Sequence, residues 1–108
     1  MAQPDIILGE HNNLFVRHMV FKKAGDQEPA HTHQYDHETV LLTGRAMFSV
    51  EGRLIEQIAP CIVFIKAHAT HHIIALEDNT QAACIHEVSK LKGNSFVGGD
   101  SLETPDAP

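Results

Sequence analysis

GDQEPAHTHQYDHETVLLTG, residues 25–44, holds three histidines at close spacing: His31, His33 and His37. Residues two apart in a β-strand point to the same face, so His31 and His33 are expected to share one. Four extended residues span about 13 Å, whereas metal–nitrogen bonds are only about 2.0–2.1 Å long. His37 can therefore join an ion with His33 only if the chain turns between them, and Asp36 favours a turn. The sequence predicts a strand, a tight loop and a second strand, with three converging imidazoles.

Histidine makes up nine of the 108 residues, and most of them lie within 31–37 and 68–72. Imidazole is the commonest metal ligand in proteins. A fourth ligand is expected from His71 or His72, and only one of these can face the interior because neighbours in a strand point to opposite sides. The apolar residues that follow do not choose between them. Unrelated surface histidines are the competing interpretation, which the regular spacing of the first cluster disfavours.

The rest of the chain has the pattern of strands rather than helices. Runs rich in β-branched and aromatic residues alternate with turn residues at intervals of about eight to twelve positions, as in sandwiches and barrels. The sequence therefore predicts one all-β domain over residues 1–90. Residues 91–108 are rich in Gly, Ser, Asp and Pro and are predicted to be a flexible tail. Strands are expected over residues 14–21, 37–43, 46–50, 54–58, 61–65, 70–76 and 81–89.

Composition excludes several classes of function. The formal net charge is −6 and the eight Lys and Arg residues are scattered, so no basic stripe is available for nucleic acid. No apolar run approaches the roughly 18 residues of a membrane-spanning helix. The N-terminal residues lack the basic start and long apolar run of a secretory signal, which predicts a cytoplasmic location. The two cysteines form no CxxC pair, so a structural zinc site is not indicated.

The first histidine cluster resembles the first sequence motif of the cupins, written G-x5-H-x-H-x3–4-E-x6-G. Gly25, His31, His33 and Gly44 match its fixed positions. The departure is His37, which occupies the position usually held by Glu.

The second cupin motif, G-x5-P-x-G-x2-H-x3-N, is degenerate in this chain. Pro60 stands where its first Gly belongs, and of the later positions His71 alone matches. The alignment of this segment to the second cupin motif favours His71 over His72 as the fourth ligand. The resemblance covers residues 15–88.

Resemblance to the cupins implies a double-stranded β-helix, or jelly-roll barrel, with a metal inside one mouth and often a homodimeric assembly. The four-histidine set is similar to that of small single-domain manganese cupins. It implies one divalent ion per chain, with Mn or Fe preferred on the resemblance, while imidazole ligands also permit Zn, Ni or Cu. The implied metal ligands are His31, His33, His37 and His71.

Cupin folds carry dioxygenases, isomerases, lyases and non-catalytic binding proteins, so the fold alone does not fix the reaction. We expect a metal-dependent oxygenase acting on a small, partly apolar substrate. The alternatives are a non-catalytic cupin that binds metal and a small molecule, and a metal-dependent isomerase or lyase, which would need an internal acid–base residue that the sequence does not reveal. The substrate pocket is predicted to include Tyr35, Thr39, Leu41, Phe48, Ile73 and His86.

Overall fold

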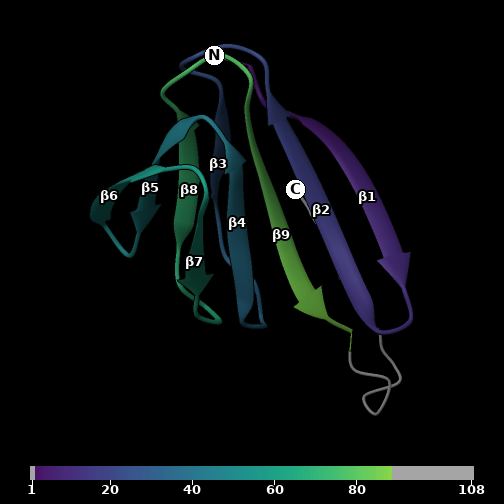
Figure 1. The fold of residues 1–108 in the computed structure, drawn as a ribbon. Helices are drawn as coiled ribbons and strands as arrows, with labels where there is room; N and C mark the ends of the chain where they lie inside the picture. Colours follow the sequence, from purple (N-terminus) through teal and green to yellow (C-terminus); the bar gives the residue numbers. More distant parts are fainter. Residues whose placement is uncertain (1, 89–108) are drawn as a thin grey trace.

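The computed structural model describes residues 2–88, which form nine β-strands in two antiparallel sheets (Figure 1). The larger sheet has the order β1-β2-β9-β4-β7 and the smaller one β3-β8-β5-β6. The strands are β1 (Asp5–His11), β2 (Leu14–Phe21), β3 (Gln27–His31), β4 (His37–Thr43), β5 (Arg45–Val50), β6 (Arg53–Ile58), β7 (Cys61–Ile65), β8 (His71–Ala75) and β9 (Thr80–Glu87).

The chain passes repeatedly from one sheet to the other. β2 lies in the larger sheet and β3 in the smaller, β4 returns to the larger sheet, and β7, β8 and β9 alternate in the same way. Two facing sheets joined by such crossings form a jelly-roll barrel. The all-β fold predicted from the sequence is confirmed. No segment of residues 2–88 forms a helix long and apolar enough to cross a membrane.

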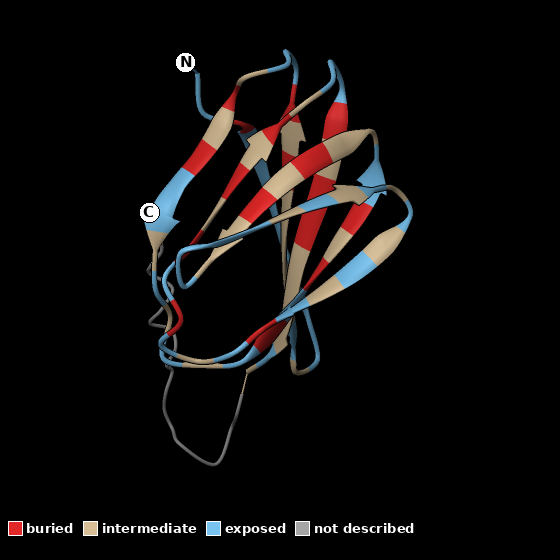
Figure 2. Cartoon of the chain, turned by 90° about the vertical axis from the view of Figure 1, so that its left-hand side faces the viewer, coloured by how far each residue is buried: buried red, intermediate tan, exposed pale blue. Residues whose placement is uncertain are grey.

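Alternating burial along the strands defines the inner face of the barrel (Figure 2). In β4, His37, Thr39 and Leu41 are buried, while Glu38 and Leu42 are exposed. This is the period of two expected for a strand with one face on a core.

The closed end of the barrel is filled by apolar side chains. Phe48 lies opposite Ile73 in the pairing of β5 with β8, and Ala46 lies opposite Ala75. Burying this cluster removes apolar surface from water and stabilises the fold at about 25 cal/mol per Å². Its buried members are Met19, Phe21, Leu41, Ala46, Phe48, Ile73, Ala75 and Ala82.

The predicted strand boundaries agree with the structure to within one or two residues, but one local prediction is wrong. β3 ends at His31, and His33 lies in the loop between β3 and β4 rather than on a strand with His31. The pairing of β3 with β8 shifts register between Glu28 and His31. The predicted tail over residues 91–108 lies outside the described residues.

Candidate metal centre

Four histidine side chains meet at the end of the barrel opposite the apolar cluster. His31 comes from the end of β3, His33 from the following loop, His37 from the start of β4 and His71 from the start of β8. The ring centroids of His31 lie 4.6 Å from His33 and 4.3 Å from His71. Those of His37 lie 5.1 Å from His33 and 5.2 Å from His71. The strand–loop–strand arrangement therefore does bring the three histidines of the first cluster together with one from the second.

Backbone pairing fixes two of these side chains and a loop contact fixes a third. His31 is the register partner of His71 in the antiparallel pairing of β3 with β8. The His33 carbonyl accepts a hydrogen bond from the His68 amide at 2.7 Å, and the Asp36 carboxylate accepts one from the Ala67 amide at 2.8 Å. The loop that carries His33 is therefore tied to the loop before β8.

Three of the four side chains have ligand atoms close enough to hold one ion. The candidate nitrogen atoms of His31, His33 and His71 all lie within 4.8 Å of one another. Two nitrogens bound to one ion at about 2.1 Å cannot lie more than about 4.2 Å apart, so only a small contraction is needed. The His37 ring contacts those of His33 and His71, but His37 does not belong to this group of three.

The tautomers of two histidines direct the same ring nitrogen toward the cluster. The Nδ1 atom of His31 donates to the Pro29 carbonyl at 2.7 Å, and that of His71 donates to the Ala69 carbonyl at 2.9 Å. A carbonyl can only accept, so each Nδ1 carries the proton and each Nε2 keeps its lone pair. Metal-binding histidines in proteins commonly donate their other ring N–H to a carbonyl or carboxylate in this way, which fixes the ring orientation.

Several ring nitrogens in the cluster are buried without a partner. His71 Nε2 and both ring nitrogens of His37 make no hydrogen bond with residues 2–88. An unsatisfied buried polar atom costs about 1–3 kcal/mol. A divalent ion would satisfy His71 Nε2 and one ring nitrogen of His37, so the residues present fit such an ion.

Burial keeps three of the four histidines of the cluster uncharged. It lowers the pKa of His33 to about 2 and that of His37 to about 3, and the neighbouring imidazoles lower both further in the same direction. Burial also lowers the pKa of His71 to about 4, against the opposing effect of its hydrogen bond to Ala69. A neutral imidazole is the form that binds a metal, so these three side chains have the required protonation state at neutral pH.

The structure reveals a carboxylate that the sequence analysis missed. Glu28 is 3% exposed, and its carboxylate lies 3.7 Å from His31 Nε2 and accepts a hydrogen bond from the Arg17 guanidinium at 2.6 Å. Residues three apart in a regular strand point to opposite faces, so strand periodicity would place Glu28 on the face opposite His31. The register shift between Glu28 and His31 lets both side chains face inward.

Aromatic and polar side chains surround the cluster on the side of the larger sheet. Tyr35 stacks on His33 at 4.7 Å between ring centroids and on His86 at 3.9 Å. Thr39 lies 3.4 Å from Cys84, and burial raises the pKa of the Cys84 thiol to about 11, which keeps it protonated. Of the residues predicted to line the pocket, Tyr35 thus lies beside the cluster in the loop between β3 and β4, and Thr39 and His86 lie on β4 and β9.

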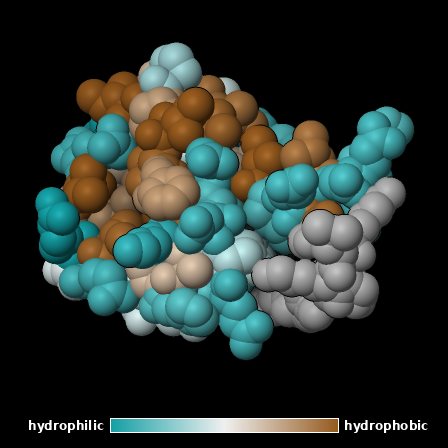
Figure 3. All heavy atoms as spheres, turned by 90° about the horizontal axis from the view of Figure 1, so that it is seen from below, coloured by the Kyte–Doolittle hydropathy of each residue, from teal (hydrophilic) through white to brown (hydrophobic). Residues whose placement is uncertain are grey.

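The other predicted pocket residues lie elsewhere. Leu41, Phe48 and Ile73 belong to the apolar cluster at the closed end of the barrel, each at most 2% exposed. The adjacent histidine His72 lies on the opposite face of β8 from His71 and is half-buried, in agreement with the choice of His71. Figure 3 views the molecule from below, the end at which β7 ends in Figure 1, and shows hydrophilic residues beside hydrophobic ones there.

Neither a family model nor a curated protein matches this sequence. Solved structures do match. KdgF from Halomonas sp. superposes with a TM-score of 0.69 at 18% identity, covering 76% of each chain. A cupin superfamily protein from Desulfitobacterium hafniense has a TM-score of 0.67 at 13% identity, covering 82% of this chain and 83% of that one. The chain has the cupin fold.

A third solved structure agrees. An RmlC-like cupin from Desulfovibrio desulfuricans has a TM-score of 0.67 at 22% identity, covering 77% of this chain and 81% of that one. All three likenesses are too distant in sequence to carry an activity over to this chain. They confirm the double-stranded β-helix that the first motif implied, and the three close histidines point to a divalent metal at its mouth.

Proposed function

We propose that this cupin is a metal-dependent enzyme with one divalent ion per chain, held by His31, His33, His37 and His71. The observation that supports it is the set of buried ring nitrogens on His37 and His71 that lack a partner. Cores normally satisfy their polar atoms, so exceptions clustered at a barrel mouth indicate a missing ligand. His37 stands where the family motif has Glu, and its inclusion as a fourth ligand rests on its ring contacts with His33 and His71.

The ion that we propose is Mn or Fe. Imidazole ligands also suit Zn, Ni and Cu, so the preference rests on the likeness to manganese cupins. Four neutral imidazoles leave the full charge of the ion uncompensated, and a six-coordinate ion would keep two positions for substrate. When bound, such an ion supplies Lewis acidity and, for Mn or Fe, redox capacity.

For the reaction we propose oxidation of a small, partly apolar substrate by O₂, as in dioxygenases. At the mouth of the barrel the chain would contribute orientation and exclusion of water. Stacking of Tyr35 between His33 and His86 gives the mouth an aromatic wall, and the neighbouring Thr39 hydroxyl offers a polar contact. The apolar cluster below the histidines closes the barrel to water from the other end.

Metal content and oxygen consumption test this proposal. Protein purified without an affinity tag should contain about one Mn or Fe per chain by plasma mass spectrometry, and should consume O₂ with some members of a panel of phenols, alkenes and diketones. Substitution of His71 by Ala should abolish both. Absence of metal after reconstitution would overturn the proposed site. Full metal occupancy without turnover of any kind would leave a non-catalytic metal-binding cupin.

A metal-dependent isomerase or lyase is the second candidate, because Glu28 supplies the internal carboxylate that such an enzyme needs. Glu28 lies beside His31 and is held by Arg17. An acid–base reaction needs a group within hydrogen-bonding reach of the substrate proton. Product formation without O₂, lost in Glu28→Gln while metal content stays normal, would favour this candidate over the oxygenase.

We also propose that this cupin forms a homodimer. Ile62 and Phe64 on β7 are 67% and 56% exposed and lie beside β4, on the outer face of the larger sheet. Contiguous exposed apolar residues are typical of protein interfaces. Light scattering coupled to size exclusion should give twice the chain mass, and Ile62→Glu should give the monomer. A monomeric wild type would contradict the proposal.

A further inference from the structure

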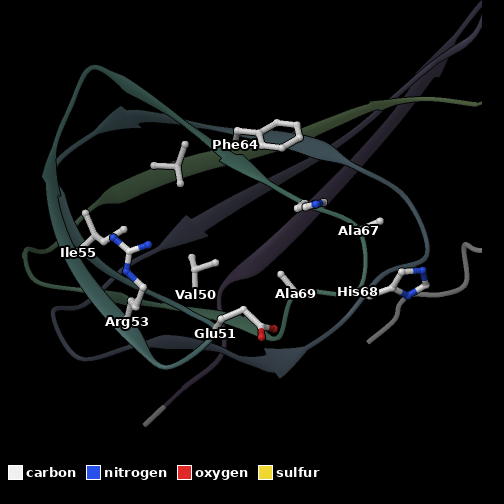
Figure 4. A pocket seen from close by; sticks show the side chains of 10 residues that line it. Val50, Glu51, Arg53, Ile55, Phe64, Ala67, His68 and Ala69 are labelled. Carbon is white, nitrogen blue, oxygen red and sulfur yellow. The ribbon is translucent and has the colours of Figure 1, made fainter.

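A pocket of about 590 Å³ lies where the two sheets open between β6 and β7 (Figure 4). Its volume falls within the range of small-molecule sites, roughly 300–1,000 Å³. It is lined by the β5–β6 hairpin, the end of β7 and the loop before β8, and none of the four histidines of the proposed metal centre lines it.

The inner wall of this pocket is apolar and reaches toward the metal centre. Val50 and Ile55 line it from the paired strands β5 and β6 of the smaller sheet, and Val63 lines it from β7 of the larger sheet. Val50 is the register partner of His71 in the pairing of β5 with β8. Paired residues on one face of a sheet have Cβ atoms about 4.5–5.5 Å apart. A ligand against this wall would therefore have one end close to the histidine cluster.

The rim of the pocket carries two cations without a carboxylate partner. Neither Arg53 nor Lys66 forms an ion pair with any residue of the described range 2–88, whereas Arg45, for comparison, pairs with both Glu56 and Glu77. Two unpaired cations beside an apolar wall form an attractive environment for an organic anion.

The one carboxylate in the lining is already engaged. Glu51 accepts a hydrogen bond from the Thr70 amide at 2.6 Å, and its own amide donates to the Thr70 carbonyl at 2.8 Å. In Figure 4 its carboxylate and the Arg53 guanidinium point to different sides of the pocket. With His68 neutral, the lining carries one net positive charge in a chain whose net charge is −6. A local positive site in an acidic protein favours anionic ligands over neutral ones.

We propose that this pocket binds a monocarboxylate with an apolar body, its carboxylate at Arg53 and its apolar part against Val50, Ile55 and Val63, with Lys66 adding positive charge to the same pocket. Arg binds carboxylates in a bidentate geometry, and Lys adds a second positive charge. Binding itself requires no metal. The further assignment of this acid as the substrate class of the metal centre rests on the proposed function.

The test uses 3-phenylpropanoate as the probe, with 3-phenylpropanol as its uncharged counterpart and inorganic phosphate as an anion without an apolar body. Titration of the chelator-treated full chain, followed by calorimetry and by amide chemical shifts, should show binding of the carboxylate at millimolar concentrations. Amides of residues 50–55 and 63–69 should shift most. The alcohol and phosphate should each bind more weakly.

Arg53→Gln and Lys66→Gln should each weaken carboxylate binding about three- to fivefold, the range expected of exposed ion pairs. Lys23→Gln is the matched control, because Lys23 is also exposed but lies outside the pocket. All three substitutions are at exposed positions, so thermal unfolding should confirm intact folds. The proposed pocket would be overturned if the three variants bound 3-phenylpropanoate equally well. It would also be overturned if wild type bound the alcohol as tightly as the carboxylate, or bound phosphate more tightly.

The two proposals fail separately. Carboxylate binding to the metal-free chain, with no turnover of any acid after metal loading, would overturn the enzyme and keep the pocket. Metal-dependent turnover of an uncharged substrate, unaffected by Arg53→Gln, would overturn the pocket as the substrate site and keep the enzyme.

Discussion

His37 and Glu38 are neighbours in sequence with opposite orientations. His37 is 2% exposed and faces the histidine cluster, whereas Glu38 is exposed on the outer face of β4. This contrast matters because the family motif places a Glu ligand at this point of the chain.

His37→Ala should therefore weaken metal binding at least tenfold, while Glu38→Ala should leave it unchanged. Loss of one ligand from a four-ligand site removes a direct metal bond, whereas loss of an outward carboxylate removes none. Competition with a fluorescent chelator gives both affinities. Equal effects of the two substitutions would contradict the assignment of His37.

Glu28 and Arg17 form a buried pair whose partners depend on each other. Removing one partner of such a pair leaves the other charge buried without compensation, at a cost of about 3–5 kcal/mol. Arg17 remains 19% exposed on its side chain, which reduces that cost.

Glu28→Gln should lower the free energy of unfolding by about 2 kcal/mol, and the double variant Arg17→Met/Glu28→Gln should recover part of it. Urea denaturation of both variants and of Arg17→Met completes the double-mutant cycle. A double variant no more stable than Glu28→Gln would show that the two side chains act independently.

At the scale of elements, the turn between β4 and β5 depends on Gly44. Its φ is +83°, and a Cβ built on it would lie 2.3 Å from Thr80 Oγ1 and 2.9 Å from Thr80 Cα. Thr80 is fully buried and bonds to the carbonyls of Arg45 and Glu77, so it has little freedom to move.

Gly44→Ala should lower the free energy of unfolding by more than about 2 kcal/mol, since backbone strain and overpacking add. Gly9→Ala is the control, because a Cβ there meets nothing within 4 Å, and it should change stability by no more than about 0.5 kcal/mol. Chemical denaturation of the two variants makes the comparison. A tolerated Gly44→Ala would mean that β5 can shift away from Thr80.

Sequence patterns predicted the elements better than the connections between them. Thr39, predicted to line the pocket, is buried on the inner face of β4, because β4 is a regular strand with one buried face. Strand periodicity failed for Glu28, since the irregularity before His31 changes which face each residue takes. The position of His33 was also beyond a parity argument, because its loop is shaped by the long-range hydrogen bond to His68.

The pocket between β6 and β7 was not predicted for a similar reason. Its lining comes from segments about fifteen residues apart, and their approach depends on how the sheets close rather than on any local pattern. From the sequence alone, Arg53 and Lys66 are indistinguishable from other solvent-exposed charged residues. Only their position beside an apolar wall distinguishes them.

At the scale of the whole molecule, the buried histidines make stability depend on pH. In the folded state the pKa values of His33, His37 and His71 are about 2, 3 and 4, against 6.5 for a free imidazole. Below pH 6.5 the unfolded chain binds protons at these positions and the folded chain does not. The free energy of unfolding therefore falls as the pH falls through 6.5, and these groups contribute no dependence well above it.

Below pH 6.5 the free energy of unfolding of the metal-free protein should fall by at most about 1.4 kcal/mol per pH unit for each of the three histidines. Urea denaturation with a chelator present, at pH values on both sides of 6.5, measures this slope. His33→Asn should reduce the slope by removing one of the three groups. A free energy of unfolding that does not change across this range would contradict the burial of neutral imidazoles.

The two ends of the barrel are held together by different means. At one end, apolar side chains from both sheets interlock. At the other, His31 and His71 belong to the smaller sheet and His37 to the larger. An ion shared by these three would act as a cross-link between the sheets, in the way a disulfide joins two distant segments. Removing the ion would let the two sheets separate at the mouth while the opposite end of the barrel stayed packed. Amide hydrogen exchange should then accelerate first in β3, β4 and β8 near the histidines.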